Sequence, residues 1–113
     1  MSDCIFCKIA SGQTETTFLY SDSDVVAFND LHPVAPVHVI IIPRRCIKNA
    51  NFLSTDTDQL IGKMVRVGSQ IAEDQGISDS GYRLVTNTNQ MAGQTIYHLH
   101  FHLIGSRVLG PIG

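Results

Sequence analysis

Near its C-terminal end the chain reads Tyr97-His98-Leu99-His100-Phe101-His102-Leu103-Ile104, so that histidines alternate with apolar residues. Successive side chains of a β-strand point to opposite faces of the sheet. The stretch therefore predicts a strand with His98, His100 and His102 on one face and three apolar side chains on the other, toward the core. In such a strand the outer two histidines lie about 13 Å apart at Cα.

Three explanations fit this row of histidines. The first is a merely hydrated strand face, which Thr, Ser or Lys would form as well. The second is a metal site, because a His-x-His pair places two nitrogen ligands on one side of a strand. The third is a catalytic site, because imidazole is a nucleophile and an acid–base group that titrates near neutral pH. The pattern favours the last two explanations over the first.

The rest of the chain predicts four more strands. Residues 37–42 are β-branched and nearly all apolar, which is typical of a strand buried on both faces. Shorter patterns predict strands at 16–20, 25–29 and 82–86, and the histidine strand extends over 96–104. The short connections between several of these strands favour antiparallel pairing.

One long helix accompanies these strands. Apolar residues recur at a period of 3.6 over residues 60–72, where they form a wide stripe. Ser54 or Thr55 can cap the start of this helix, and Gly76 is a natural stop. A shorter helical pattern covers residues 5–9. We expect an α+β fold in which one main helix covers one side of a five-stranded antiparallel sheet.

Composition indicates one folded unit, and residues 1–113 are expected to form a single domain. Apolar residues make up 43% of the chain and the mean hydropathy is +0.09, which excludes a disordered protein. A formal charge of −2 argues against a nucleic-acid polymer as partner. The longest apolar run, Val39 to Ile42, is too short to span a membrane. Arg44, Arg45 and Lys48 form a local basic cluster, either a hydrated loop or a weak anion site.

The N-terminus shows no export signal, so we expect a cytoplasmic location. The chain has three cysteines, an odd number that disulfides cannot pair completely. Reduced thiols are therefore expected. Cys4 and Cys7 form a C-x-x-C motif, but no strand precedes it, which disfavours a redox role.

The histidine segment resembles the signature of the histidine triad (HIT) superfamily, His-φ-His-φ-His-φ-φ with φ apolar. Four further segments are similar to segments of that family. Cys4-Ile5-Phe6-Cys7-Lys8-Ile9 resembles its N-terminus, and Phe28-Asn29-Asp30-Leu31-His32-Pro33 its nucleoside-binding segment. Pro36-Val37-His38-Val39-Ile40-Ile41-Ile42-Pro43 resembles its upstream histidine strand, and Ala92-Gly93-Gln94-Thr95-Ile96-Tyr97 the loop before the triad. The spacing is that of the Hint branch.

The resemblance implies a purine nucleoside phosphoramidase, a nucleotidyl hydrolase or transferase that separates a nucleoside 5′-phosphate from an amine or another leaving group. It also implies a homodimer in which the sheet continues across both subunits as ten strands. Two other classes remain open from the sequence, namely a non-catalytic purine nucleotide-binding module and a metal-storage protein. Hint proteins often end in a tail that contains tryptophan and reaches the partner's active site. This chain contains no tryptophan, so its preference among leaving groups stays open.

The resemblance also implies roles for individual residues. His100 matches the nucleophile that forms a nucleotidyl-histidine intermediate, His102 the donor to the leaving atom, and His38 the upstream histidine that supports them. Asp30 matches the ribose contact. The residues that match phosphate contacts are Asn87, Gly93, Gln94 and Thr95, the last standing where the family usually has serine. The residues that match the base pocket are Ile5, Phe6, Ile9, Phe28 and Leu31.

Some HIT proteins bind structural zinc, and the corresponding ligands here are Cys4, Cys7, Cys46 and His98. Cys46 stands where the family usually has histidine. The exchange preserves a zinc ligand and produces a Cys₃His set, which is typical of a closed structural site. All three cysteines of the chain are used in this set, and His100 and His102 are left for chemistry.

Overall fold

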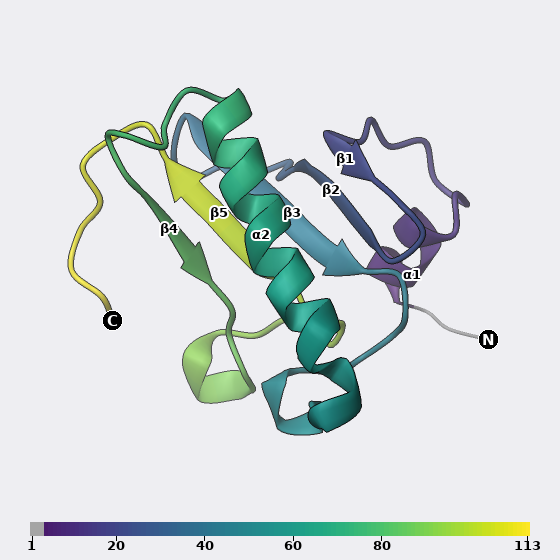
Figure 1. Ribbon diagram of the computed structural model, residues 1–113. Coiled ribbons are helices and arrows are strands. Elements are labelled where there is room, and N and C mark those ends of the chain that lie inside the picture. The colour runs from purple at the N-terminus through teal and green to yellow at the C-terminus, as the bar shows by residue number, and fades with distance from the viewer. Residues whose placement is uncertain (1–3) are drawn as a thin grey trace.

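The computed structural model describes residues 4–113 and contains one antiparallel sheet in the order β1-β2-β3-β5-β4. The predicted α+β fold, a five-stranded antiparallel sheet with one main helix, is confirmed (Figure 1). The strands are β1 (Tyr20–Ser21), β2 (Val25–Asn29), β3 (Val37–Pro43), β4 (Tyr82–Val85) and β5 (Phe101–Gly105). The helices are α1 (Ile5–Ala10) and α2 (Asp58–Asp74), and short 3-10 turns are η1 (Ala50–Phe52), η2 (Thr55–Thr57) and η3 (Gln90–Ala92).

The main helix α2 begins after a capped 3-10 turn. Ser54 and Thr57 form a capping box, in which the Ser54 N–H donates to Thr57 Oγ1 over 3.0 Å. The helix ends before Gly76, whose φ of +76° suits glycine. Gly68 lets the helix approach the sheet closely, because a Cβ there would lie 3.0 Å from a Leu84 methyl. Val65 belongs to the predicted apolar stripe but is exposed.

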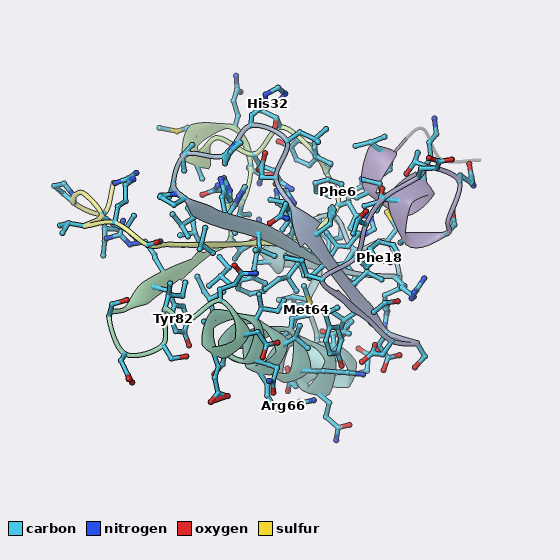
Figure 2. The ribbon with its side chains drawn as sticks, turned by 90° about the horizontal axis from the view of Figure 1, so that it is seen from above. Phe6, Phe18, His32, Met64, Arg66 and Tyr82 are labelled. Atoms are coloured by element: carbon cyan, nitrogen blue, oxygen red, sulfur yellow. The ribbon has the colours of Figure 1, made fainter. Side chains whose placement is uncertain are left out.

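The two faces of the sheet are covered differently. Figure 2 shows Met64 of α2 and Phe6 of α1 on opposite sides of the strands. Strand β3 is apolar toward both sides: Val39 and Ile41 pack in the α2 core, whereas Ile40 and Ile42 pack with Phe6. The prediction that only one side is covered was therefore incomplete. A strand that is apolar on both faces needs cover on both, and α1 supplies it over part of the second face.

Two predicted strand boundaries were wrong. The last strand was predicted over 96–104 but begins at Phe101, because the preceding backbone bonds elsewhere: the Leu99 N–H donates to Ile47 O over 2.6 Å. The first was predicted over 16–20, but only Tyr20 and Ser21 pair with β2 as a strand. In the part of the chain that the structure describes, no helix has the length and apolar character needed to cross a membrane.

Candidate active site and metal centre

The three triad imidazoles lie on the α1 side of the sheet. Phe6 contacts two of them, with ring centroids 6.0 Å from His98 and 4.9 Å from His100. The His100 and His102 centroids are 5.1 Å apart. Leu99 and Leu103 are buried in the α2 core on the opposite side. The alternation predicted for a strand thus holds, although only His102 lies within β5.

The imidazole of His100 has a defined tautomer. Its Nδ1 lies 2.7 Å from the carbonyl oxygen of His98, which can only accept, so Nδ1 carries the proton. The lone pair is then on Nε2, to which no hydrogen bond is formed within residues 4–113. Burial lowers the pKa of His100 below its ordinary value, against a smaller opposing effect of its bond to His98. His100 therefore presents a neutral, nucleophilic nitrogen.

His38 and His102 form a hydrogen-bonded pair beside Asp30. The Val34 N–H donates to Nδ1 of the buried His38 over 3.1 Å, so the His38 proton is on Nε2. That Nε2 lies 2.9 Å from His102 Nδ1 and 3.3 Å from Asp30 Oδ2. When His38 donates to His102 Nδ1, the proton of His102 is on its own Nε2. Desolvation, followed by the charges of His100 and His38, lowers the pKa of His102 to about 4.

The ligand atoms of Asp30, His38 and His102 are close enough together to hold a metal ion. The tautomer of His38 opposes this use. Since Nδ1 already accepts the Val34 N–H, Nε2 carries a proton and has no lone pair for a metal. The group is therefore suited to moving a proton.

An open cavity of about 500 Å³ lies beside the triad. All five residues predicted for the base pocket line it, together with Asp30. Its predominantly apolar wall suits a flat aromatic group. Sequence reasoning missed part of this wall, although Asn29 and His32 lie in the segment 28–33 that resembles the family's nucleoside-binding segment. The missed residues are Glu15, Thr16, Thr17, Asn29, His32, Ile40 and Ile96.

The loop before the triad is held by the side chain of Gln94, which is only 6% exposed. Its Nε2 donates to Lys48 O and Ile96 O over 2.9 and 3.1 Å. Its Oε1 accepts from Asn49 Nδ2 and from the Asn89 N–H over 3.1 and 2.8 Å. Both N–H donors of this amide have backbone partners within the protein, and the phosphate contact expected of Gln94 stays a prediction.

Asn49, which sequence reasoning missed, is buried and holds the same loop by bonding to both Asn89 and Gln94. No sequence signal identified it, because a lone asparagine is typical of an exposed turn. The other residues expected at the phosphate remain accessible: Gly93 and Thr95 are exposed, and Asn87 is half-buried. Gly93 has a φ of +88°, which a non-glycine residue rarely adopts.

The four residues expected at zinc lie together. One Sγ or nitrogen atom from each of Cys4, Cys7, Cys46 and His98 falls within 4.8 Å of the others, so the group could hold a metal ion. His98 Nε2 lies 2.8 Å from Pro43 O and so carries the proton, which turns the Nδ1 lone pair toward the thiols. The Nδ1 atom is 3.4 Å from Cys4 Sγ and 3.3 Å from Cys7 Sγ. These separations resemble ligand spacings around a tetrahedral zinc, which are about 3.5 Å for sulfur and nitrogen.

The basic cluster is only partly a hydrated loop. Arg44 donates to backbone oxygens of Ala10 and Asp22, the latter over 2.7 Å from Nε, and to Ser21 Oγ over 3.0 Å. Its guanidinium therefore ties the end of α1 to the β1–β2 turn. Lys48 lies over the Phe52 ring, 5.4 Å from its centroid. These contacts argue against an anion site built on Arg44.

Comparison with known proteins agrees with this geometry. A family model described as "Scavenger mRNA decapping enzyme C-term binding" matches residues 3–112. The purine nucleoside phosphoramidase of Escherichia coli K12 is 44% identical over 110 residues, covering 97% of this chain and 92% of that protein.

Solved structures show the same fold. A HIT family hydrolase from Clostridium thermocellum superimposes with a TM-score of 0.94 at 41% identity, covering 99% of this chain and 97% of the other. A HIT family hydrolase from Legionella pneumophila gives a TM-score of 0.93 at 39% identity, covering 96% of each chain. With its full-length relatives, its shared fold and its intact row of three histidines, the chain belongs to the histidine triad family, as its sequence predicts.

Proposed function

We propose that the protein is a hydrolase that cleaves purine nucleoside 5′-phosphoramidates and releases a nucleoside monophosphate. The observation that carries this proposal is the free lone pair on Nε2 of a neutral His100, next to the proton-bearing pair His38–His102. A neutral nucleophile beside an acid is the pair that displacement of an amine from phosphorus requires. The full-length similarity to a purine nucleoside phosphoramidase supports the same substrate class.

In the proposed mechanism, His100 Nε2 attacks the phosphorus and the bond from phosphorus to the amine breaks. A bound anionic phosphate raises the pKa of His102 and favours its imidazolium form, whose Nδ1–H donates to His38 Nε2 once the His38 proton has moved to Nδ1. The Nε2 proton of this imidazolium then passes to the departing amine, which leaves His102 neutral. Water then attacks the phosphorus and gives a proton to the neutral His102, the bond between phosphorus and His100 breaks, and the monophosphate is released. Gly93 and Thr95, with Asn87, are proposed to bind the phosphate oxygens, where donors stabilise the developing charge.

The nucleoside is proposed to occupy the cavity beside α1. Ile5, Phe6, Ile9, Phe28 and Leu31 would contact the base there. Asp30 also lines this cavity, and its carboxylate can accept hydrogen bonds from both ribose hydroxyls. A non-catalytic nucleotide-binding module would need the same cavity, but it would not need the defined tautomers of His38 and His100.

We infer that Cys4, Cys7, Cys46 and His98 hold a structural zinc ion. The donor set fits zinc, since three sulfurs and one nitrogen fill a tetrahedral shell completely. Burial raises the pKa of the Cys4 thiol, so binding a cation there would displace protons. These four residues join the start of α1 to the residues before β5. They thereby hold Phe6 of α1 against the rings of both His98 and His100.

We further propose that the protein is a cytoplasmic homodimer. Residues 1–113 of each subunit would form a single domain. Thiols are kept reduced in the cytoplasm, as metal binding by three cysteines requires. Strand β4 lies at one edge of the sheet, opposite the two-residue β1, and its outer edge offers backbone groups for pairing with a second copy. Light scattering in solution should give twice the mass of the chain.

The test of the proposed activity is release of AMP from adenosine 5′-phosphoramidate by the purified protein. We expect steady turnover, with a parallel guanosine substrate also accepted because an apolar pocket discriminates weakly between purines. Binding of AMP without any turnover of either substrate would favour the non-catalytic module.

The low pKa of His100 predicts the pH dependence of activity. A lowered pKa keeps the imidazole neutral, and so nucleophilic, to a more acidic pH than a free histidine of pKa about 6.5. We expect kcat/KM for a nucleoside 5′-phosphate ester with a good leaving group to stay level from pH 8 to below pH 6.5 and to fall only at more acidic pH. A loss of activity centred above pH 6.5 would contradict this assignment.

A further inference from the structure

The cavity beside α1 is lined in part by the connection that leads from this helix to β1, residues 11–19 (Figure 1). Three consecutive residues of this connection, Glu15, Thr16 and Thr17, belong to the cavity wall. Of the described residues that line the cavity, only Glu15 and Asp30 have a carboxylate. Asp30 is the proposed ribose contact, so Glu15 is a charged group of the wall that the proposed mechanism does not use.

The connection that contains this glutamate is anchored at both ends. Arg44 donates to Ala10 O just before the connection and to Ser21 Oγ just after it, the latter over 3.0 Å. The Leu19 N–H donates to Ala27 O over 2.8 Å, which attaches the end of the connection to β2. The glutamate between these anchors is therefore held beside the cavity.

The Glu15 carboxylate is available to a ligand. The residue is exposed, and within residues 4–113 its side chain forms neither a hydrogen bond nor an ion pair. A ligand that covers a carboxylate removes water from it, which costs free energy unless the ligand donates hydrogen bonds in return. A base that offers N–H donors to Glu15 is therefore favoured over one that does not.

Purine bases differ in this property. Guanine has two adjacent donors, N1–H and the 2-amino group, and one carboxylate can accept from both. Adenine has a lone pair on N1, which a negative carboxylate repels, and a single amino group beside it. Hypoxanthine has the N1–H without the 2-amino group. The apolar wall of the cavity contacts the flat faces of all three bases in the same way, so only their edges can be distinguished.

We propose that Glu15 is a specificity-determining residue, whose carboxylate accepts hydrogen bonds from N1–H and the 2-amino group of guanine and so favours guanosine over adenosine substrates. This inference rests on the proposed binding of the nucleoside in the cavity beside α1. Both purines enter the cavity, and Glu15 sets the ratio between them. Because water competes for an exposed carboxylate, the preference is several-fold and not many orders of magnitude.

The chain offers a matched control, because its only other glutamate is Glu73. Glu73 is also exposed, but it belongs to α2 and does not line the cavity. Glu15→Gln and Glu73→Gln remove the same negative charge from the same type of residue. Comparing guanosine with adenosine substrates within each variant cancels the effect of that charge on the phosphate, which both substrates share.

The experiment measures kcat/KM with the 5′-phosphoramidates of guanosine, inosine and adenosine. For the wild type we expect values in that order, with about a fivefold difference between guanosine and adenosine. Glu15→Gln should bring this ratio to within about twofold of one, because a neutral amide offers an acceptor to guanine and a donor to adenine N1. Glu73→Gln should keep the wild-type ratio. Equal values for guanosine and adenosine in the wild type, or an unchanged ratio in Glu15→Gln, would overturn the proposal.

Calorimetry with GMP and AMP tests the same inference without turnover. We expect the wild type and Glu73→Gln to bind GMP several-fold more tightly than AMP, and Glu15→Gln to lose this difference. If the difference is found but none of the phosphoramidates is hydrolysed, the proposed activity is wrong and the role of Glu15 stands. Equal affinity of the wild type for GMP and AMP would refute that role whether or not the protein turns over its substrates.

Discussion

His100→Ala is expected to lower kcat for adenosine 5′-phosphoramidate by at least about 10³-fold, because the variant has no atom to form the covalent intermediate. Neither His98 nor His102 can replace it. His98 Nε2 bonds to Pro43 O and its Nδ1 faces the thiols, while His102 Nδ1 bonds to His38. The rate of AMP release at saturating substrate, compared between the variant and the wild type, measures this loss.

The same variant should keep its fold and its nucleotide pocket. His100 is only half-buried, and the cavity beside α1 is lined by other residues. AMP affinity by calorimetry and the thermal midpoint should therefore stay close to the wild-type values. In the wild type, protein quenched in base during turnover should carry a nucleotidyl group on His100. Full activity of His100→Ala, or labelled substrate that never attaches to this ring, would contradict the assignment.

Removal of the zinc proposed at Cys4, Cys7, Cys46 and His98 is expected to lower the free energy of unfolding strongly. These four residues join the start of α1, the residues before β5 and Cys46, which are far apart in sequence. Without the metal, α1 would no longer be fixed over its face of the sheet. A loss of about 3 kcal/mol would lower the thermal midpoint of a domain of this size by more than about ten degrees. Elemental analysis should find one equivalent of zinc in protein with intact thiols, and a chelator should lower the midpoint.

Position 46 provides the matched control for this prediction. Cys46→His keeps a nitrogen ligand in place of the sulfur and should retain zinc and most of the stability, whereas Cys46→Ser should lose both. Both substitutions remove the same exposed thiol. Zinc content well below one equivalent in the intact protein, or equal content in the two variants, would contradict the metal assignment.

Local patterns were sufficient for most of the fold. The period of α2, the apolar strand β3 and the alternation around His100 are properties of neighbouring residues, so they could be recognised without the tertiary structure. The boundaries of the last strand could not. Whether residues 96–100 pair as a strand depends on competition from Ile47 O, which belongs to a distant segment and accepts the Leu99 N–H.

For the candidate site, too, some features follow from the sequence alone and others only from the tertiary structure. The types and order of residues, namely three alternating histidines and a matching set of cysteines, were sufficient to assign the family and to identify His98, His100 and His102 as candidate site residues. The nitrogen that carries the proton is set in each ring by a backbone group. These groups are Pro43 O for His98, His98 O for His100 and the Val34 N–H for His38. The tautomers and the four hydrogen bonds of the Gln94 amide emerged only in the folded chain, because hydrogen bonds between segments depend on distances that residue order does not encode.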